Sequence, residues 1–205
     1  MLGNGGSSDR DTPVPVEGLE DFILTDIAVG HSFNLALTAE GLVFGWGRND
    51  AGQLGLGGGL AMDIHAMEEL PCLVDSLASA GEKVVAIAAG VTHAAAATES
   101  GKLFMWGMKR YLEPEWMTVL DGKQVVRVGC GDRYTVAVTS DHEVYSFGMG
   151  KSCCLGHGNK TSQPQPTLVE ALLGQRVEVV ACGNKHMGAL VRPGQAPPTP
   201  WPPER

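Results

Sequence analysis

The sequence predicts an all-β fold, a partial β-propeller built from four-stranded antiparallel blades. Two observations lead to this prediction: one strand-sized pattern recurs four times, and the 205 residues include 28 glycines but few aromatic residues. Repetition at a period of roughly 50 residues is typical of propellers and solenoids. Abundant glycine suits many short strands joined by tight turns. We expect about three and a half blades arranged as an open arc.

Each copy of the repeat contains a glycine that ends a short apolar run and a ring-bearing side chain three residues later. The glycines are Gly30, Gly90, Gly131 and Gly183, and the rings belong to Phe33, His93, Tyr134 and His186. In the first three copies an aromatic-glycine pair begins 16 residues after that glycine, at Trp46, Trp106 and Phe147. A second marker, Leu-Gly-x-Gly, begins at Leu2, Leu54 and Leu155.

The first copy divides into three expected strands, Asp26 to Val29, Asn34 to Thr38 and Leu42 to Trp46, because these runs are rich in apolar and β-favouring residues. Glu40-Gly41 makes the tight turn between the last two. A shorter fourth strand is expected in each unit. Its four copies are Pro13 to Val16, Pro71 to Val74, Trp116 to Val119 and Pro166 to Val169. Proline at the start of such a strand fits an edge position, where a missing N–H is harmless.

The expected units lie near residues 2–53, 54–107, 108–154 and 155–191, followed by a proline-rich disordered tail at 192–205. The second unit carries eight extra residues near Leu60 to Met67, and the third has lost the Leu-Gly-x-Gly marker. The tail contains six prolines, which favour an extended polyproline segment. Pro200-x-x-Pro203-x-Arg205 also fits a Src-homology-3 ligand, although a plain tail outside the repeats is the favoured interpretation.

Composition narrows the classes of partner. The net charge of −8 disfavours non-specific binding to nucleic acid, and we expect no nucleic acid partner. Neither a signal peptide nor a membrane span is expected. The five cysteines include no Cys-x-x-Cys pair, and Cys130 and Cys182 share one repeat position, which indicates small buried strand residues. We therefore expect thiols in a reducing compartment, the cytoplasm first and the nucleus as an alternative.

The segment from Trp46 to Gly57, Trp-Gly-Arg-Asn-Asp-Ala-Gly-Gln-Leu-Gly-Leu-Gly, resembles the signature of the regulator of chromosome condensation repeat. Ile27 to Leu37 is similar to the second half of that repeat. The resemblance covers about residues 1–191 and implies a seven-bladed propeller, of which this chain looks like a partial copy with about four repeats.

The family includes guanine-nucleotide exchange factors, chromatin-associated proteins, parts of ubiquitin ligases and a plant ultraviolet-B photoreceptor. The photoreceptor of the family uses tryptophan-rich segments. At the equivalent positions this chain has Gly90-Val-Thr-His and Gly131-Asp-Arg-Tyr, without tryptophan, which argues against that role. Chromatin binding would favour a basic surface, and ligase activity would need a catalytic domain. Fold similarity alone does not choose among these roles.

We expect no catalytic, cofactor or metal site, and so no enzyme activity. Gly150-Lys151-Ser152 looks like the end of a phosphate-binding loop, but the glycine needed five positions earlier is Tyr145. No histidine pair has the spacing of metal ligands near a carboxylate. Cys153-Cys154 replaces the Gly52-Gln53 of the repeat, and ordinary loop cysteines are the favoured interpretation.

The turns that follow each marker glycine and each aromatic-glycine pair are expected to gather on one face, the usual docking surface of a propeller. The candidate partner-binding residues are Arg48, Asn49, Asp50, Asp132, Arg133, Asn184 and Lys185. The favoured function is a non-catalytic protein-interaction module, a scaffold or adaptor, with a small GTPase as one candidate partner. The alternatives are an exchange factor for a Ran-like GTPase and a truncated product with little function. We also expect self-association through open sheet edges.

Overall fold

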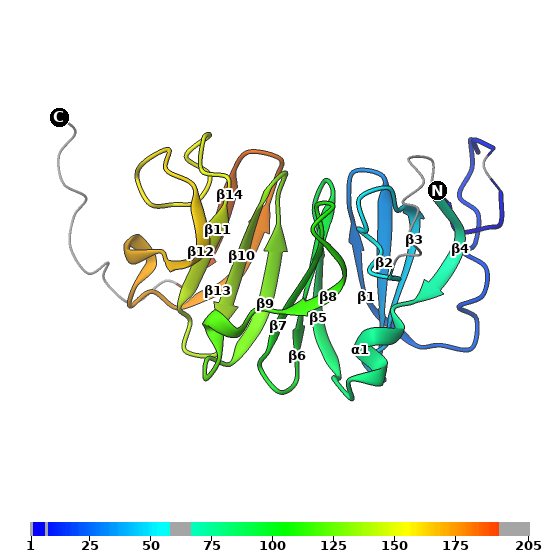
Figure 1. Ribbon diagram of the computed structural model, residues 1–205, viewed down its shortest axis with the longest axis horizontal. Coiled ribbons are helices and arrows are strands. Elements are labelled where there is room, and N and C mark those ends of the chain that lie inside the picture. The colour runs from blue at the N-terminus through cyan, green and yellow to red at the C-terminus, as the bar shows by residue number, and fades with distance from the viewer. Residues whose placement is uncertain (1, 7, 58–66, 193–205) are drawn as a thin grey trace.

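The computed structural model describes residues 2–6, 8–57 and 67–192, which form fourteen strands, one short α-helix and two short 3-10 turns (Figure 1). The first sheet contains β1 (Leu24–Val29), β2 (Phe33–Thr38), β3 (Val43–Arg48) and β4 (Met67–Leu73). The second contains β5 (Val84–Ala89), β6 (His93–Thr98), β7 (Leu103–Gly107) and β8 (Tyr111–Trp116). The third contains β9 (Val125–Cys130), β10 (Tyr134–Thr139), β11 (Val144–Gly148) and β12 (Gln163–Leu168). The fourth contains β13 (Val177–Cys182) and β14 (Met187–Val191).

Every sheet is an antiparallel meander in which strands adjacent in sequence are hydrogen-bonded, and the four sheets follow one another in a row (Figure 1). The predicted all-β partial propeller is therefore confirmed: three four-stranded sheets and one two-stranded sheet form an open arc. The first and last sheets lie at opposite ends of that arc. No helix among the described residues is long and apolar enough to cross a membrane.

Three apolar clusters hold the arc together, one at each junction between neighbouring sheets. The first is centred on Leu35, Ile87 and Trp106, the second on Leu103 and Ala137, and the third includes Val136, Leu155 and Val177. Side chains alternate along β6, so Ala94 and Ala96 join the first cluster while Ala95 and Ala97 join the second. Both faces of the middle sheets are buried, which explains the nearly continuous apolar sequence of β6.

The predicted position of the fourth strand is wrong by several residues. The observed strands β4, β8 and β12 begin earlier than expected, and no strand forms at Pro13 to Val16. The valines that looked like strand ends, Val74 and Val169, make one last backbone bond to the third strand and then turn into the core at 0% and 1% exposure. A short helical turn follows them, α1 (Asp75–Ser79) or the 3-10 turn Glu170–Leu172, and leads to the next sheet.

In each of the first three sheets, the fourth strand pairs with the third and so joins the strands that precede it in sequence. The sheets therefore span residues 24–73, 84–116, 125–168 and 177–191; each of the first three crosses a junction between the sequence units, and the fourth lies within the last unit. The residues around 60–66 and the proline-rich tail from 193 onward lie outside the described residues, so the extra loop and the Src-homology-3 motif stay predictions.

The aromatic-glycine pairs are required by the backbone. Gly47, Gly107 and Gly148 have φ values of +101°, +99° and +109°, a region that side chains rarely adopt. A Cβ atom on Gly47 would lie 2.7 Å from the Ser32 carbonyl oxygen. The glycine therefore lets the end of β3 approach the turn between β1 and β2.

The first sheet presents an uncovered inner strand at the end of the arc. Ile27 on β1 is 64% exposed, whereas Ile87, which occupies the same repeat position on β5, is 7% exposed. Leu19, Ala36, Phe44 and Trp46 form a separate cluster that covers the outer part of this face. The uncovered part is the surface that each later sheet uses to pack on its predecessor.

Candidate functional site

The two predicted sets of turns do lie on one face of the arc. The backbone N–H groups of Arg48, Met108 and Met149 each follow an aromatic-glycine pair. They donate to the carbonyls of Ser32, Thr92 and Arg133, and each donor-acceptor distance is 2.8 Å. We call this surface the turn face. It consists of the inner turns at residues 30–32, 90–92, 131–133 and 183–186 and the outer turns at 48–52, 108–110 and 149–152.

The inner turns of neighbouring sheets are hydrogen-bonded to one another. The N–H of His31 donates to the Gly90 carbonyl at 3.1 Å, and the N–H of Val91 donates to the Gly131 carbonyl at 3.3 Å. The N–H of Asp132 donates to the Asn184 carbonyl at 3.0 Å. The inner turns therefore form a continuous row across the four sheets.

The first outer turn is held by its own polar side chains. The Asn49 side-chain oxygen accepts the N–H of Leu54 at 3.0 Å, and Asp50, which is 8% exposed, accepts a bond from Gln53 at 3.3 Å. Arg48 forms a 2.7 Å ion pair with Asp50, and this guanidinium lowers the pKa of the Asp50 carboxyl. Of the three predicted residues, Asn49 and Asp50 shape the loop, and Arg48 has 48% of its side chain exposed.

The other predicted residues lie in the third and fourth inner turns. Asp132 is partly buried, and Arg133, Asn184 and Lys185 are exposed. The Tyr134 hydroxyl lies 2.9 Å from the Gly183 carbonyl oxygen and 2.5 Å from that of His186, so it fixes the turn that carries Asn184 and Lys185. Burial raises the pKa of this hydroxyl, which keeps it protonated as a donor. These four residues therefore project from rigid turns that are bonded to each other.

Charge is segregated between the turn face and the face on the other side of the arc. The cationic side chains of the turn face are Arg48, Lys109, Arg110, Arg133, Lys151 and Lys185, against the carboxylates of Asp50 and Asp132. Within the described residues, Arg48 is the one member of this set with an ion-pair partner. The sequence could not reveal this because the chain as a whole has a net charge of −8.

We call the other side the opposite face. It consists of the hairpin turns at 39–42, 99–102 and 140–143 and the connections at 74–83, 117–124 and 169–176; α1 lies at its edge in Figure 1. Its carboxylates are Glu40, Asp75, Glu82, Glu99, Asp121, Asp141, Glu143 and Glu170. Its lysines are paired with carboxylates: Lys83 with Glu99 at 3.3 Å, Lys102 with Glu82 at 2.5 Å and Lys123 with Glu143 at 2.7 Å. Its arginine, Arg176, has no ion-pair partner among the described residues.

The segments weighed for catalysis are loop and packing residues. Lys151 lies in an exposed turn, where the N–H of Gly150 donates to the Ser162 hydroxyl at 3.1 Å. Cys154 belongs to the third apolar cluster, and burial raises the pKa of its thiol. No group of three or more His, Cys, Asp or Glu side chains that could hold a metal ion occurs in the described part of the chain.

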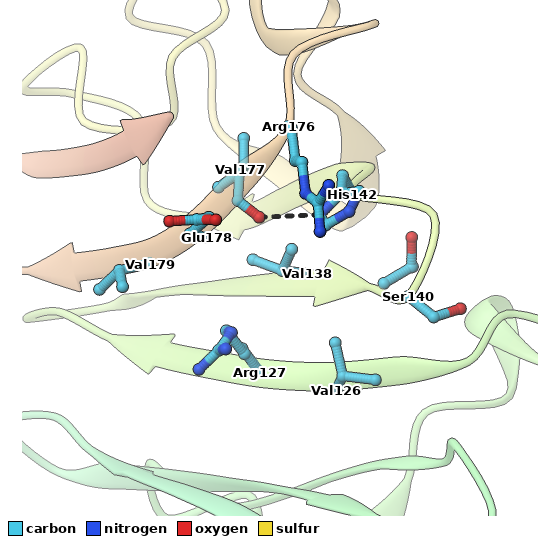
Figure 2. Close-up of a pocket in the computed structure, with 10 residues that line it drawn as sticks. Val126, Arg127, Val138, Ser140, His142, Arg176, Val177, Glu178 and Val179 are labelled. Carbon is cyan, nitrogen blue, oxygen red and sulfur yellow. Dashed lines mark hydrogen bonds between the residues drawn. The ribbon is translucent and has the colours of Figure 1, made fainter. Parts of the chain in front are cut away.

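One concave site was missed by sequence reasoning. A cleft of about 420 Å³ lies between β9, the turn after β10 and the start of β13, and includes Arg127, His142 and Arg176 in its lining (Figure 2). The only sequence signal was that Asp141-His142 replaces the Xaa-Gly turn used by the first two copies.

Comparison with known proteins identifies the repeat. A model described as "Regulator of chromosome condensation (RCC1) repeat" matches residues 40–97 and 141–190, and a second model of the same repeat matches 24–53, 84–111 and 125–152. The chain is 36% identical to the ultraviolet-B receptor UVR8 of Arabidopsis thaliana over 95% of this chain and 45% of that protein. It is 34% identical to the human E3 ubiquitin-protein ligase HERC2 over 94% of this chain and 4% of that protein.

Solved structures show the same fold. The structure of human WBSCR16 superposes with a TM-score of 0.72 and 26% identity, covering 85% of this chain and 46% of that chain. Yeast RCC1 (Prp20), solved with Kap60 bound, superposes with a TM-score of 0.67 and 23% identity, covering 82% and 41%. The chain thus spans less than half the length of each of these relatives. Since the repeat model covers more than half of its residues and the fold agrees, the chain belongs to the regulator of chromosome condensation (RCC1) repeat family.

Proposed function

We propose that this chain is a non-catalytic protein-interaction module, an adaptor, that binds an acidic surface of a partner protein through its turn face. The observation that carries the proposal is the excess of cationic side chains on that face of an acidic chain. All of them except Arg48 lack an ion-pair partner among the described residues, and Arg133 and Lys185 lie on turns that are hydrogen-bonded together. Complementary charge steers association and selects the partner.

The relatives support a shared scaffold more than a shared reaction. Two of them are named a receptor and a ubiquitin-protein ligase, and this chain is at least 34% identical to each. Because proteins with different activities share this repeat, we infer that the repeat supplies a binding surface and that residues or domains particular to each protein supply its activity. The rigid turns of a propeller are suited to this role because loops on a stable scaffold tolerate change.

The test measures binding of fluorescein-labelled poly-L-glutamate by anisotropy. In the double variant Arg133→Gln/Lys185→Gln we expect weaker binding, because each exposed charge contact contributes about 0.5–1 kcal/mol, which for two contacts corresponds to roughly a 5- to 30-fold rise in Kd. The matched control Lys83→Gln/Lys123→Gln removes the same two charges from the opposite face and should leave Kd within about two-fold. Equal effects of the two double variants would overturn the proposal.

Two further arms separate the alternatives. Binding of a 20-base-pair DNA duplex more tightly than poly-L-glutamate would replace the protein partner by nucleic acid. Release of fluorescent GDP from a Ran-class GTPase, stimulated by substoichiometric amounts of this chain, would replace the adaptor by an exchange factor. We expect neither, because the chain is acidic overall and the turn face offers cations to a carboxylate-rich surface.

A further inference from the structure

The cleft between the third and fourth sheets is a departure from the repeat. In the first two hairpin turns the corresponding position is glycine, Gly41 and Gly101, both at a φ of +86°. The next sheet packs directly on these glycines, since a Cβ atom at either one would overlap the side chain of Lys83 or Gln124. The N–H groups of Val84 and Val125 then donate to the carbonyls of Gly41 and Gly101 at 3.2 and 3.0 Å.

The third hairpin turn carries a histidine where the repeat has glycine. His142 has a φ of +64°, a conformation that a side chain rarely adopts. At the earlier junctions the N–H of the first residue of the next sheet donates to the carbonyl of the turn glycine. Here the equivalent N–H, that of Val177, donates to the Gln175 carbonyl at 3.1 Å, so this backbone bond between the sheets is missing among the described residues. The His142 Nδ1–H instead donates to the Val177 carbonyl at 2.9 Å, since a carbonyl only accepts. The ring therefore stands between the two sheets where the backbones otherwise meet.

The space beside this ring is lined by cations and valines. Arg127 on β9 and Arg176 just before β13 occupy opposite walls of the cleft, on either side of Val138 in Figure 2. Neither guanidinium has a hydrogen-bond or ion-pair partner among the described side chains. Among the described residues that line the cleft, Glu178 is the single carboxylate, and it is paired with Arg192 at 2.7 Å.

The two arginines are particular to this junction. The residues at the repeat position of Arg127 in the other sheets are Asp26, Ala86 and Val179. Those at the position of Arg176 are Ile23, Lys83 and Gln124. The junction between the third and fourth sheets is therefore the one that places an arginine on both walls. Val126, Val138 and Val179 complete an apolar surface between them.

We propose that this cleft binds a small organic anion, whose phosphate or carboxylate group pairs with Arg127 and Arg176 and whose apolar body packs on the valines. Arginine suits this role because its planar guanidinium donates two parallel hydrogen bonds to such groups. A volume of about 420 Å³ lies within the range of small-molecule sites. The site opens on the opposite face, so it is separate from the turn face and does not depend on the adaptor proposal. His142 is a positioning residue that keeps the junction open.

Calorimetric titration with phenyl phosphate, benzoate and inorganic phosphate tests the proposal, with backbone amide NMR shifts at residues 140–142 and 176–178 to locate binding. We expect saturable binding of phenyl phosphate or benzoate, and the stronger of the two identifies the anionic group. Inorganic phosphate should bind more weakly because it has no apolar body. Equal binding of inorganic phosphate and phenyl phosphate would overturn the role of the valines.

Variants separate the site from general charge effects. Arg127→Gln/Arg176→Gln should weaken binding at least about ten-fold, because it removes two charged hydrogen-bond donors. The matched control Arg10→Gln/Lys160→Gln removes two exposed cations that line neither the cleft nor the turn face and should leave affinity unchanged. His142→Gly restores the residue used by the first two turns and should close the cleft, abolishing binding while both arginines remain. Unchanged affinity in the first or third variant, or no saturation by either organic anion in the unmodified chain, would overturn the proposal.

Discussion

A matched pair of isoleucines tests whether the end of the arc is open. Ile27 and Ile87 are the same residue at the same repeat position on equivalent strands, with 64% and 7% of their surface exposed. Replacing either isoleucine by alanine removes three carbon atoms, and the loss of β-propensity is the same at both positions. The difference between the two losses in free energy of unfolding therefore reports burial alone. Ile87 packs in the first apolar cluster between the first two sheets.

The expected magnitudes follow from the exposed fractions. Full burial of three methylene-sized groups contributes about 2.4 kcal/mol at roughly 0.8 kcal/mol each. Ile87→Ala therefore loses nearly all of this and leaves a cavity as well, for a total cost of about 3 kcal/mol. Ile27→Ala loses about a third of the transfer energy and leaves no cavity, so its cost is below about 1 kcal/mol.

The assay is urea unfolding of both variants, followed by circular dichroism and tryptophan fluorescence at two protein concentrations. The predicted gap in the free energy of unfolding is about 2 kcal/mol. Equal destabilisation at both concentrations would refute the conclusion that this strand is uncovered. A cost at Ile27 that grows with concentration would show that a second copy covers the strand, which is the self-association expected from the sequence.

Two further predictions concern the buried polar side chains His93 and Trp106. Burial lowers the pKa of His93 from 6.5 to about 4. The unfolded chain therefore takes up this proton at higher pH than the folded chain, and stability falls by about 3 kcal/mol in total as the pH drops from 6.5 to 4, levelling off below. His93→Phe, which introduces the residue that the first copy has at this position, should remove this part of the pH dependence, and an unchanged slope in urea titrations at several pH values would contradict it. Trp106 donates its indole N–H to the Gln53 carbonyl at 2.9 Å inside the core. Trp106→Phe should fit, since Phe147 fills that repeat position, but it should lower stability by about 1–3 kcal/mol in thermal unfolding because a buried carbonyl loses its donor; a loss under about 0.5 kcal/mol would contradict the role of the bond.

Local pattern was enough to place most strands. The apolar run, the marker glycine and the ring three residues later define β1 and β2, and the aromatic-glycine pair defines β3, because each feature depends only on near neighbours in the chain. The fourth strand was misplaced because Val74 and Val169 have high β-propensity but are needed as core residues of the connecting turn. Packing against the next sheet overrides the local preference there.

The candidate surface was predictable only in part. The spacing of the turns placed them on one face, but it gave no sign that Asn49 and Asp50 bond within their own loop. The net charge of −8 gave no sign of the excess of cations on the turn face. Consecutive turns of a meander alternate between the two faces, so the residues of one face are scattered along the sequence. His142 drew no attention because its effect on the cleft depends on a sheet that begins more than thirty residues later.

Short-range spacing in the chain encodes the repeat, the all-β class, the family and the positions where glycine is required. The folded chain sets which strand completes which sheet, which polar turn residues stay exposed, and which two arginines line one cleft. These depend on how one sheet packs on the next. Burial, pairing of charges and the space between sheets are properties of residues far apart in the chain, so only the folded arc defines them.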